Sequence, residues 1–111
     1  MTNEKKLEEM MLELGFSEVL QGTEHIRQAV VLWNKTPHMQ LSGELYPAIA
    51  AAAAASAAQI ERRMRHAIER AWQQGNPQLQ REVFGWTYSA EMGRPRVGEV
   101  VARLARVCRE N

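Results

Sequence analysis

Apolar residues recur at helical spacing through most of this chain, and this periodicity limits its fold more than any other feature. In the first such segment the apolar side chains fall at positions i, i+3, i+4 and i+7, namely Leu7, Met10, Met11 and Leu14. No convincing alternation of apolar and polar residues occurs, so the sequence lacks the signature of half-buried strands. We therefore predict an all-α fold of six helices, with residues 1–111 forming a single domain around one hydrophobic core.

Residues that cap a helix or cannot continue it mark the expected helix ends. The expected N-caps are Thr23, Ser56 and Asn76. The residues expected just beyond helix ends are Gly15, Pro37, Gly75 (as a C′ residue) and Gly85. The third helix should begin around residues 43–46 and the last near Arg96. The buried faces of the later helices are expected to consist of Ile26, Ala29, Val30, Trp33, Ile60, Met64, Ala67, Ile68, Ala71, Trp72, Val97, Val100, Val101, Leu104 and Cys108.

Residues 48–58 include nine alanines, and alanine has the highest helix propensity. Continuous helix would be the default interpretation of this stretch. However, Ser56 followed by Gln59 matches the capping box S-x-x-Q in front of an apolar-periodic run. We therefore predict a break near residues 53–56 and a new helix over about 57–74. The face of that helix opposite its apolar stripe carries Gln59, Arg62, Arg65, His66, Glu69 and Gln73.

The sequence lacks the residues that several classes of chemistry require. The chain contains no Asp, so no aspartyl nucleophile or phosphoacceptor is possible within it. The three histidines and Cys108 lack the close pairings of structural zinc sites, and neither Gly-rich phosphate-binding motif is present. We therefore expect no enzyme activity, metal or cofactor. A single cysteine and the absence of a long apolar run favour a cytoplasmic protein without a membrane span.

Charge is distributed unevenly, although the formal net charge is only +1. Residues 1–24 carry six Glu against two Lys, whereas segments 59–72 and 94–111 are rich in Arg. Arginine can hold phosphate or guanine through two hydrogen bonds. The isoelectric point near 8.0 nevertheless lies below the usual range of nucleic-acid-binding domains, so net charge alone leaves DNA binding open.

A short helix, a turn of small residues and a longer helix with a polar face are typical of a helix-turn-helix. In that motif the second helix enters the major groove of DNA while the first crosses the backbone. Near the start of the helix predicted over 57–74, Gln59 and Arg62 can donate hydrogen bonds to bases, and Glu61 can accept one from cytosine. Arg-rich helix faces are also often simply solvated, and the residues alone favour neither interpretation.

The string IERRMRHAIERAWQQGN at 60–76 resembles the recognition helix of a known family, the C-terminal effector domain of the sporulation master response regulator of endospore-forming bacteria. Further matching strings are LGF at 14–16, IRQAV at 26–30, LYPAIA at 45–50 and FGWTYS at 84–89. The resemblance covers roughly residues 7–109. It implies a six-helix DNA-binding domain that pairs as a homodimer on tandem promoter boxes and regulates transcription at entry into sporulation.

The resemblance also implies roles for individual residues. The family's base-reading positions fall on Gln59, Glu61 and Arg62. Its phosphate-contacting positions fall on Ser56, Arg65 and His66. Arg94 and Arg96 resemble the region used for backbone contacts and for contacts with the transcription machinery, RNA polymerase included.

The sequence departs from the family at two places. The family has an arginine where this chain has Gln59; glutamine prefers adenine, or else serves to cap its own helix. The family's Lys- and Thr-rich turn is replaced by the alanines of 50–55, which removes positive charge near the DNA backbone. The additional Arg63 compensates for this loss if it faces the duplex.

These departures, together with the near-neutral charge, leave a second interpretation open: a protein-interaction module that has lost DNA affinity and modulates a full-length relative. The family's usual receiver domain is absent from the sequence. The chain is then either a part of a longer protein or a stand-alone effector domain.

Overall fold

The computed structural model describes residues 1–36, 39–85 and 92–110. Its elements are α1 (Glu4–Leu14), α2 (Gln21–Lys35), the short π-helix η1 (Leu41–Leu45), α3 (Tyr46–Ala53), α4 (Ala57–Gln74), α5 (Pro77–Phe84) and α6 (Val97–Val107). Within these ranges there is no strand, and only an isolated bridge joins Thr2 to Arg109. The prediction of an all-α fold with six α-helices is therefore confirmed.

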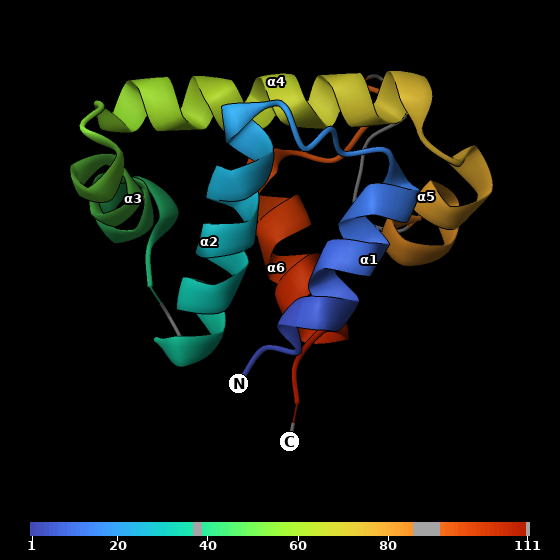
Figure 1. Cartoon of the computed structure of the whole chain (residues 1–111), viewed down its shortest axis with the longest axis horizontal. Helices are drawn as coiled ribbons and strands as arrows, with labels where there is room; N and C mark the ends of the chain where they lie inside the picture. Colours follow the sequence, from blue (N-terminus) through green and yellow to red (C-terminus); the bar gives the residue numbers. More distant parts are fainter. Residues whose placement is uncertain (37–38, 86–91, 111) are drawn as a thin grey trace.

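The helices are arranged around α4, which runs across one side of the molecule (Figure 1). α2 and α6 extend away from α4, α3 lies beside its N-terminal end, and α5 follows its C-terminal end. The core lies where these helices meet, and its largest fully buried side chains include Phe16, Ile26, Ile60, Met64, Phe84 and Leu104. This packing buries one side of α4 and leaves its other side at the surface.

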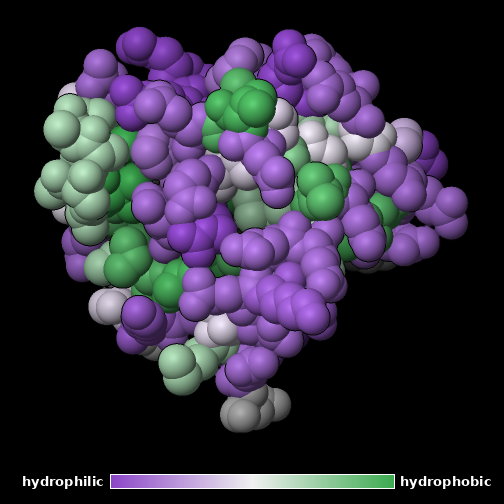
Figure 2. All heavy atoms as spheres, in the orientation of Figure 1, coloured by the Kyte–Doolittle hydropathy of each residue, from purple (hydrophilic) through white to green (hydrophobic). Residues whose placement is uncertain are grey.

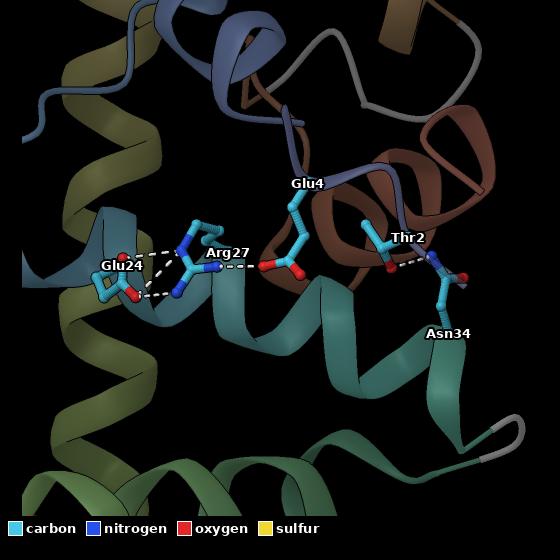
Figure 3. Close-up of polar contacts among 5 residues, drawn as sticks. All are labelled: Thr2, Glu4, Glu24, Arg27 and Asn34. Atoms are coloured by element: carbon cyan, nitrogen blue, oxygen red, sulfur yellow. Dashed lines mark hydrogen bonds and ion pairs between the residues drawn. The ribbon is translucent and has the colours of Figure 1, made fainter. Parts of the chain in front are cut away.

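Two groups of polar contacts fix the N-terminal segment and α1 against α2 (Figure 3). Arg27 on α2 donates to Glu24 one helical turn earlier and to Glu4 of α1, the latter at 2.9 Å. Asn34, near the end of α2, donates to the Thr2 hydroxyl at 2.7 Å and to the Ala105 carbonyl of α6 at 3.1 Å. The chain's two ends are thus tied to the helix that supports α4.

Most of the predicted helix ends are confirmed. Gly15 closes α1 in the left-handed conformation, Asn76 caps α5 with its side chain, and the break before α4 falls at 54–56. Cys108 is buried as predicted, and burial raises the pKa of its thiol. Trp33 and Trp72, however, are only partly buried. The predicted helix end at Pro37, the histidine His38 and residues 86–89 of the string FGWTYS lie outside the described residues.

The prediction that Thr23 caps the second helix is wrong. α2 begins two residues earlier, at Gln21, with Leu20 as its N-cap, and Thr23 lies in its first turn. The physical reason is the close packing of this turn on α4: a methyl group on Gly22 would lie 1.9 Å from the Arg63 carbonyl oxygen. Because α2 already includes Gly22, the backbone of its first turn packs against the backbone of α4 at Arg63. A helix that began after Thr23 would leave Gly22 outside the helix.

Gly75 follows α4 as predicted, but its backbone is extended (φ −82°) rather than left-handed. A glycine is required here because the chain passes close to the end of α1: a methyl group on Gly75 would lie 1.9 Å from the Leu14 carbonyl oxygen. The end of α1 therefore packs directly against the end of α4. The sequence identifies the position of this glycine but not the reason for it.

Candidate nucleic-acid interface

A tight turn at residues 54–56 joins α3 to α4. Ala54 ends α3 in the left-handed conformation (φ 54°, ψ 45°), and its N–H donates to the Ala50 carbonyl. Ser56 then begins α4: its hydroxyl accepts from the Gln59 N–H at 3.1 Å, while Gln59 Oε1 accepts from the Ser56 N–H at 2.9 Å. This reciprocal capping box, predicted from the sequence, fixes the residue at which α4 starts.

One stripe of α4 is buried and the opposite face is exposed. The buried residues are Ile60, Met64, Ala67, Ile68 and Ala71, as predicted. The exposed polar residues of the helix are Gln59, Arg62, Arg65, His66, Arg70, Gln73 and Gln74. The close contact between Gly22 and the Arg63 carbonyl holds the helix on its inner side. α4 is therefore a rigidly supported helix that presents long polar side chains to the surface.

Arg62 and His66 lie one turn apart on the exposed face. Neither makes a hydrogen bond or ion pair with any other residue in the part of the chain that the structure describes. A guanidinium without an internal partner keeps all five of its N–H donors for an external one. These two side chains are the ones on α4 best placed to bind an anion or a base edge.

A chain of alternating charges runs along one edge of this face. Arg65 donates through Nη1 to both carboxylate oxygens of Glu61, at 2.8 and 2.7 Å. Its Nε lies 4.0 Å from Glu69 Oε1, and the same oxygen lies 3.9 Å from Arg94 Nη2. Glu69 thus connects Arg65 on α4 to Arg94 in the segment before α6.

A cleft of about 380 Å³ lies along this edge, between α4 and the start of α6. Three arginines line it: Arg65, Arg94 and Arg96. Arg96 is exposed, precedes α6 as its N-cap, and makes no ion pair among the described residues. Tyr46 forms part of the lining; burial raises the pKa of its hydroxyl, and the nearby Glu61 carboxylate acts in the same direction. The cleft is therefore lined by basic groups, two of which are neutralised by Glu61 and Glu69.

Arg63 lies on the other edge of α4, against α2. Its Nη1 lies 3.4 Å from Nε2 of His25, a side chain that is only 6% exposed. Burial lowers the pKa of His25; a Gln28 hydrogen bond opposes this effect, and the Arg63 charge adds to it. His25 is therefore neutral at pH 7 and can accept a hydrogen bond from the guanidinium. Arg63 is only partly exposed in this position.

The structure thus divides the predicted site residues among three surfaces. Ser56 at the N-cap of α4 and Gln59, Arg62 and His66 within the helix are exposed; Glu61, Arg65, Arg94 and Arg96 lie along the cleft; Arg63 lies against α2. Sequence reasoning missed the roles of Glu69 and His25. Spacing of i, i+4 from Arg65 could have identified Glu69, whereas the His25–Arg63 contact depends on tertiary packing and leaves no sequence signal.

The alanines around the turn form an apolar surface beside the start of α4. Ala48, Ala51, Ala52, Ala53, Ala54 and Ala58 are all exposed. Figure 2 shows this surface as a pale green area over α3, next to the hydrophilic surface of α4. A surface of methyl groups offers no hydrogen bond or charge to a phosphate backbone. This part of the interface therefore differs chemically from the polar face of α4.

Two features are absent from the described part of the molecule: a cluster of metal-binding side chains and a membrane-spanning helix. No three side chains of His, Cys, Asp or Glu come close enough there to hold a metal ion. None of the helices formed by the described residues is both long and apolar enough to cross a membrane. The polar face of α4 and the adjoining cleft form the candidate binding surface.

A comparison with protein families agrees with the resemblance seen in the sequence. The family of the C-terminal domain of the sporulation initiation factor Spo0A matches residues 7–107. This range extends from within α1 to the end of α6, and so includes the turn, all of α4 and the cleft. The chain therefore belongs to the family of Spo0A C-terminal domains, the DNA-binding effector domains of sporulation regulators.

Proposed function

We propose that this domain binds DNA sequence-specifically and regulates transcription, with α3, the turn at 54–56 and α4 acting as a helix-turn-helix. α4 enters the major groove and α3 crosses the phosphate backbone. The observation that carries this proposal is the pair Arg62 and His66, exposed on a helix that is buried along its opposite side and without internal partners among the described residues. Base recognition requires long side chains that donate hydrogen bonds from a well-supported helix.

The proposal assigns base contacts to Gln59, Glu61 and Arg62, because they lie in the first two turns of α4. It assigns phosphate contacts to Ser56, His66, Arg94 and Arg96, which surround those turns or line the cleft. Arg63 joins this group if it leaves His25. Arg65 is assigned to neither group here, because its guanidinium already donates to Glu61.

The family relationship supports a wider proposal. Two copies bind side by side on tandem promoter boxes, and the segment carrying Arg94 and Arg96 is available to RNA polymerase. Val101 and Leu104 of α6 are fully buried in the monomer, so a dimer contact through α6 would have to use other residues of that helix. A regulator of this kind acts in the cytoplasm, where bacterial DNA lies.

Substitution of Arg62 tests the proposal against a matched control. Arg62→Ala should weaken binding to the preferred duplex by about 10- to 100-fold and relax specificity at one base pair. Arg81→Ala removes the same charge from an exposed position on α5, at the other end of the molecule from the turn, and should change affinity little (Figure 1). Preferred duplexes can be selected from a random library. Equal losses for both variants on preferred and scrambled duplexes would contradict the assignment of Arg62 to a base.

A second candidate function is favoured by the exposed alanines of α3 and the turn. An apolar surface at the position where the DNA backbone would pass suits a protein partner better than a phosphate. In this case the domain pairs with a full-length relative and modulates it. Mixing the two proteins would then give heterodimers by size-exclusion chromatography, and the domain alone would shift no duplex.

A further inference from the structure

The contact between Arg65 and Glu61 gives Arg65 a role that differs from a simple phosphate contact. One nitrogen, Nη1, donates to both carboxylate oxygens at 2.8 and 2.7 Å, an arrangement that favours one position of the carboxylate. Glu69 lies on the other side of the same guanidinium, 4.0 Å from Nε. With a carboxylate on each side, part of the positive charge of Arg65 is already compensated within the protein. A guanidinium in this setting contributes little net attraction for a phosphate.

Glu61 needs such a partner if it is to approach DNA. An uncompensated carboxylate would be repelled by the phosphates on either side of the groove. A free Glu side chain would also lose rotamer freedom on contacting a base, whereas this one is already held. The Glu61 side chain remains 33% exposed, and a carboxylate has about four lone-pair positions, of which Arg65 occupies two. Two positions are left for a donor such as the amino group of cytosine.

We propose that Arg65 is a positioning residue that acts through Glu61, so that the two residues recognise one base pair as a unit. The assignment rests on the proposed DNA-binding function. Glu69, which also faces Arg94, holds Arg65 from the side away from Glu61. The proposal explains why a domain that reads DNA carries an acidic residue at the edge of its recognition surface.

A double-mutant cycle tests this role. Wild type, Glu61→Gln, Arg65→Ala and the double variant would be titrated by fluorescence anisotropy against the preferred duplex and against duplexes with one base pair changed at a time. At the base pair where Glu61→Gln loses discrimination, Arg65→Ala should lose it to a similar extent, about tenfold. In the Glu61→Gln background, Arg65→Ala should cause no further loss of discrimination, because its effect passes through Glu61.

The salt dependence of binding distinguishes this role from a phosphate contact. If Arg65 acts through Glu61, Arg65→Ala leaves the slope of log K against log salt nearly unchanged. If Arg65 binds a phosphate, Arg65→Ala makes the slope shallower by about 0.9 and lowers the affinity equally for every duplex in both backgrounds. This result would overturn the proposal. The proposal also fails if the wild type discriminates but Glu61→Gln does not alter discrimination anywhere. A wild-type domain that discriminates between no sequences would instead refute the proposed function itself. Circular dichroism of each variant checks that its helices are intact.

Discussion

Gly22 of α2 lies directly against the carbonyl oxygen of Arg63 in α4, so closely that a methyl group on Gly22 would be 1.9 Å from that oxygen. The contact sets the distance between α4 and the helix that supports it. Gly22→Ala should therefore destabilise the domain by about 3 kcal/mol, because neither backbone can move without disturbing the core. Gly43→Ala is the matched control, since its methyl group would meet only the flexible Gln40 side chain, at 3.3 Å. Urea denaturation of both variants measures the difference, and equal stabilities would show that α2 and α4 are not in close contact.

Ala54 adopts the left-handed conformation (φ 54°), which is unfavourable for any residue with a side chain. Ala54→Gly removes this strain and should raise the free energy of unfolding by about 1 kcal/mol. Ala51→Gly, in the middle of α3, should lower it by about 1 kcal/mol, because glycine weakens a helix interior. Thermal melts of the two variants would shift in opposite directions. A lower melting temperature for Ala54→Gly would mean that the turn has a different conformation.

Gln59 serves both the capping box and the proposed base contact, and two substitutions separate these roles. Gln59→Glu keeps an acceptor for the Ser56 N–H but loses the amide donor that the proposed contact with adenine requires. Its stability should stay within a few tenths of a kcal/mol of wild type while its affinity for the preferred duplex falls about tenfold. Ser56→Ala should instead cost about 1 kcal/mol of stability and leave the discrimination between duplexes intact. Chemical denaturation and anisotropy would be measured for both variants. Unchanged binding of Gln59→Glu would limit Gln59 to capping.

His25 makes the stability of the domain depend on pH. Burial lowers its pKa in the folded state, so below about pH 6.5 the unfolded chain binds more protons than the folded one. Stability should therefore decrease as the pH falls from about 7.5 to about 5.5, and it should recover as the pH rises again. His25→Gln removes this proton-binding group. Urea denaturation at both pH values should show a smaller pH effect in the variant, and an equal effect would mean that His25 titrates alike in both states.

The sequence predicts the parts of this structure that depend on local patterns. Helical periodicity identifies the buried stripe of α4, and the S-x-x-Q pattern identifies its first residue, because both arise from residues within one or two turns. Close backbone contacts leave no such pattern. Gly75 can be recognised as a helix end but not as the contact with Leu14. Thr23 looks like a cap because the contact of the neighbouring Gly22 with α4 leaves no sequence signal.

The same distinction applies to the candidate site. Glu61 and Arg65 are four residues apart, so their ion pair follows from helix geometry. Arg63 is only two residues from Arg65, yet it lies against His25, thirty-eight residues earlier in the chain. Whether an arginine of α4 faces outward or contacts a neighbouring helix is decided by tertiary packing. The composition of the face can therefore be predicted, whereas the number of its arginines that are free to bind DNA cannot.

Sequence-specific DNA binding by the intact domain is the central claim, and fluorescence anisotropy tests it most directly. The wild-type domain would be titrated against a duplex with two tandem boxes of the family and against a scrambled duplex of the same length, over a series of salt concentrations. We predict binding to the tandem boxes at least about 1000-fold tighter than to the scrambled duplex, with a steep decrease in affinity as salt rises. Weak binding that does not distinguish the two duplexes at any salt concentration would contradict the account and favour a protein partner for this surface.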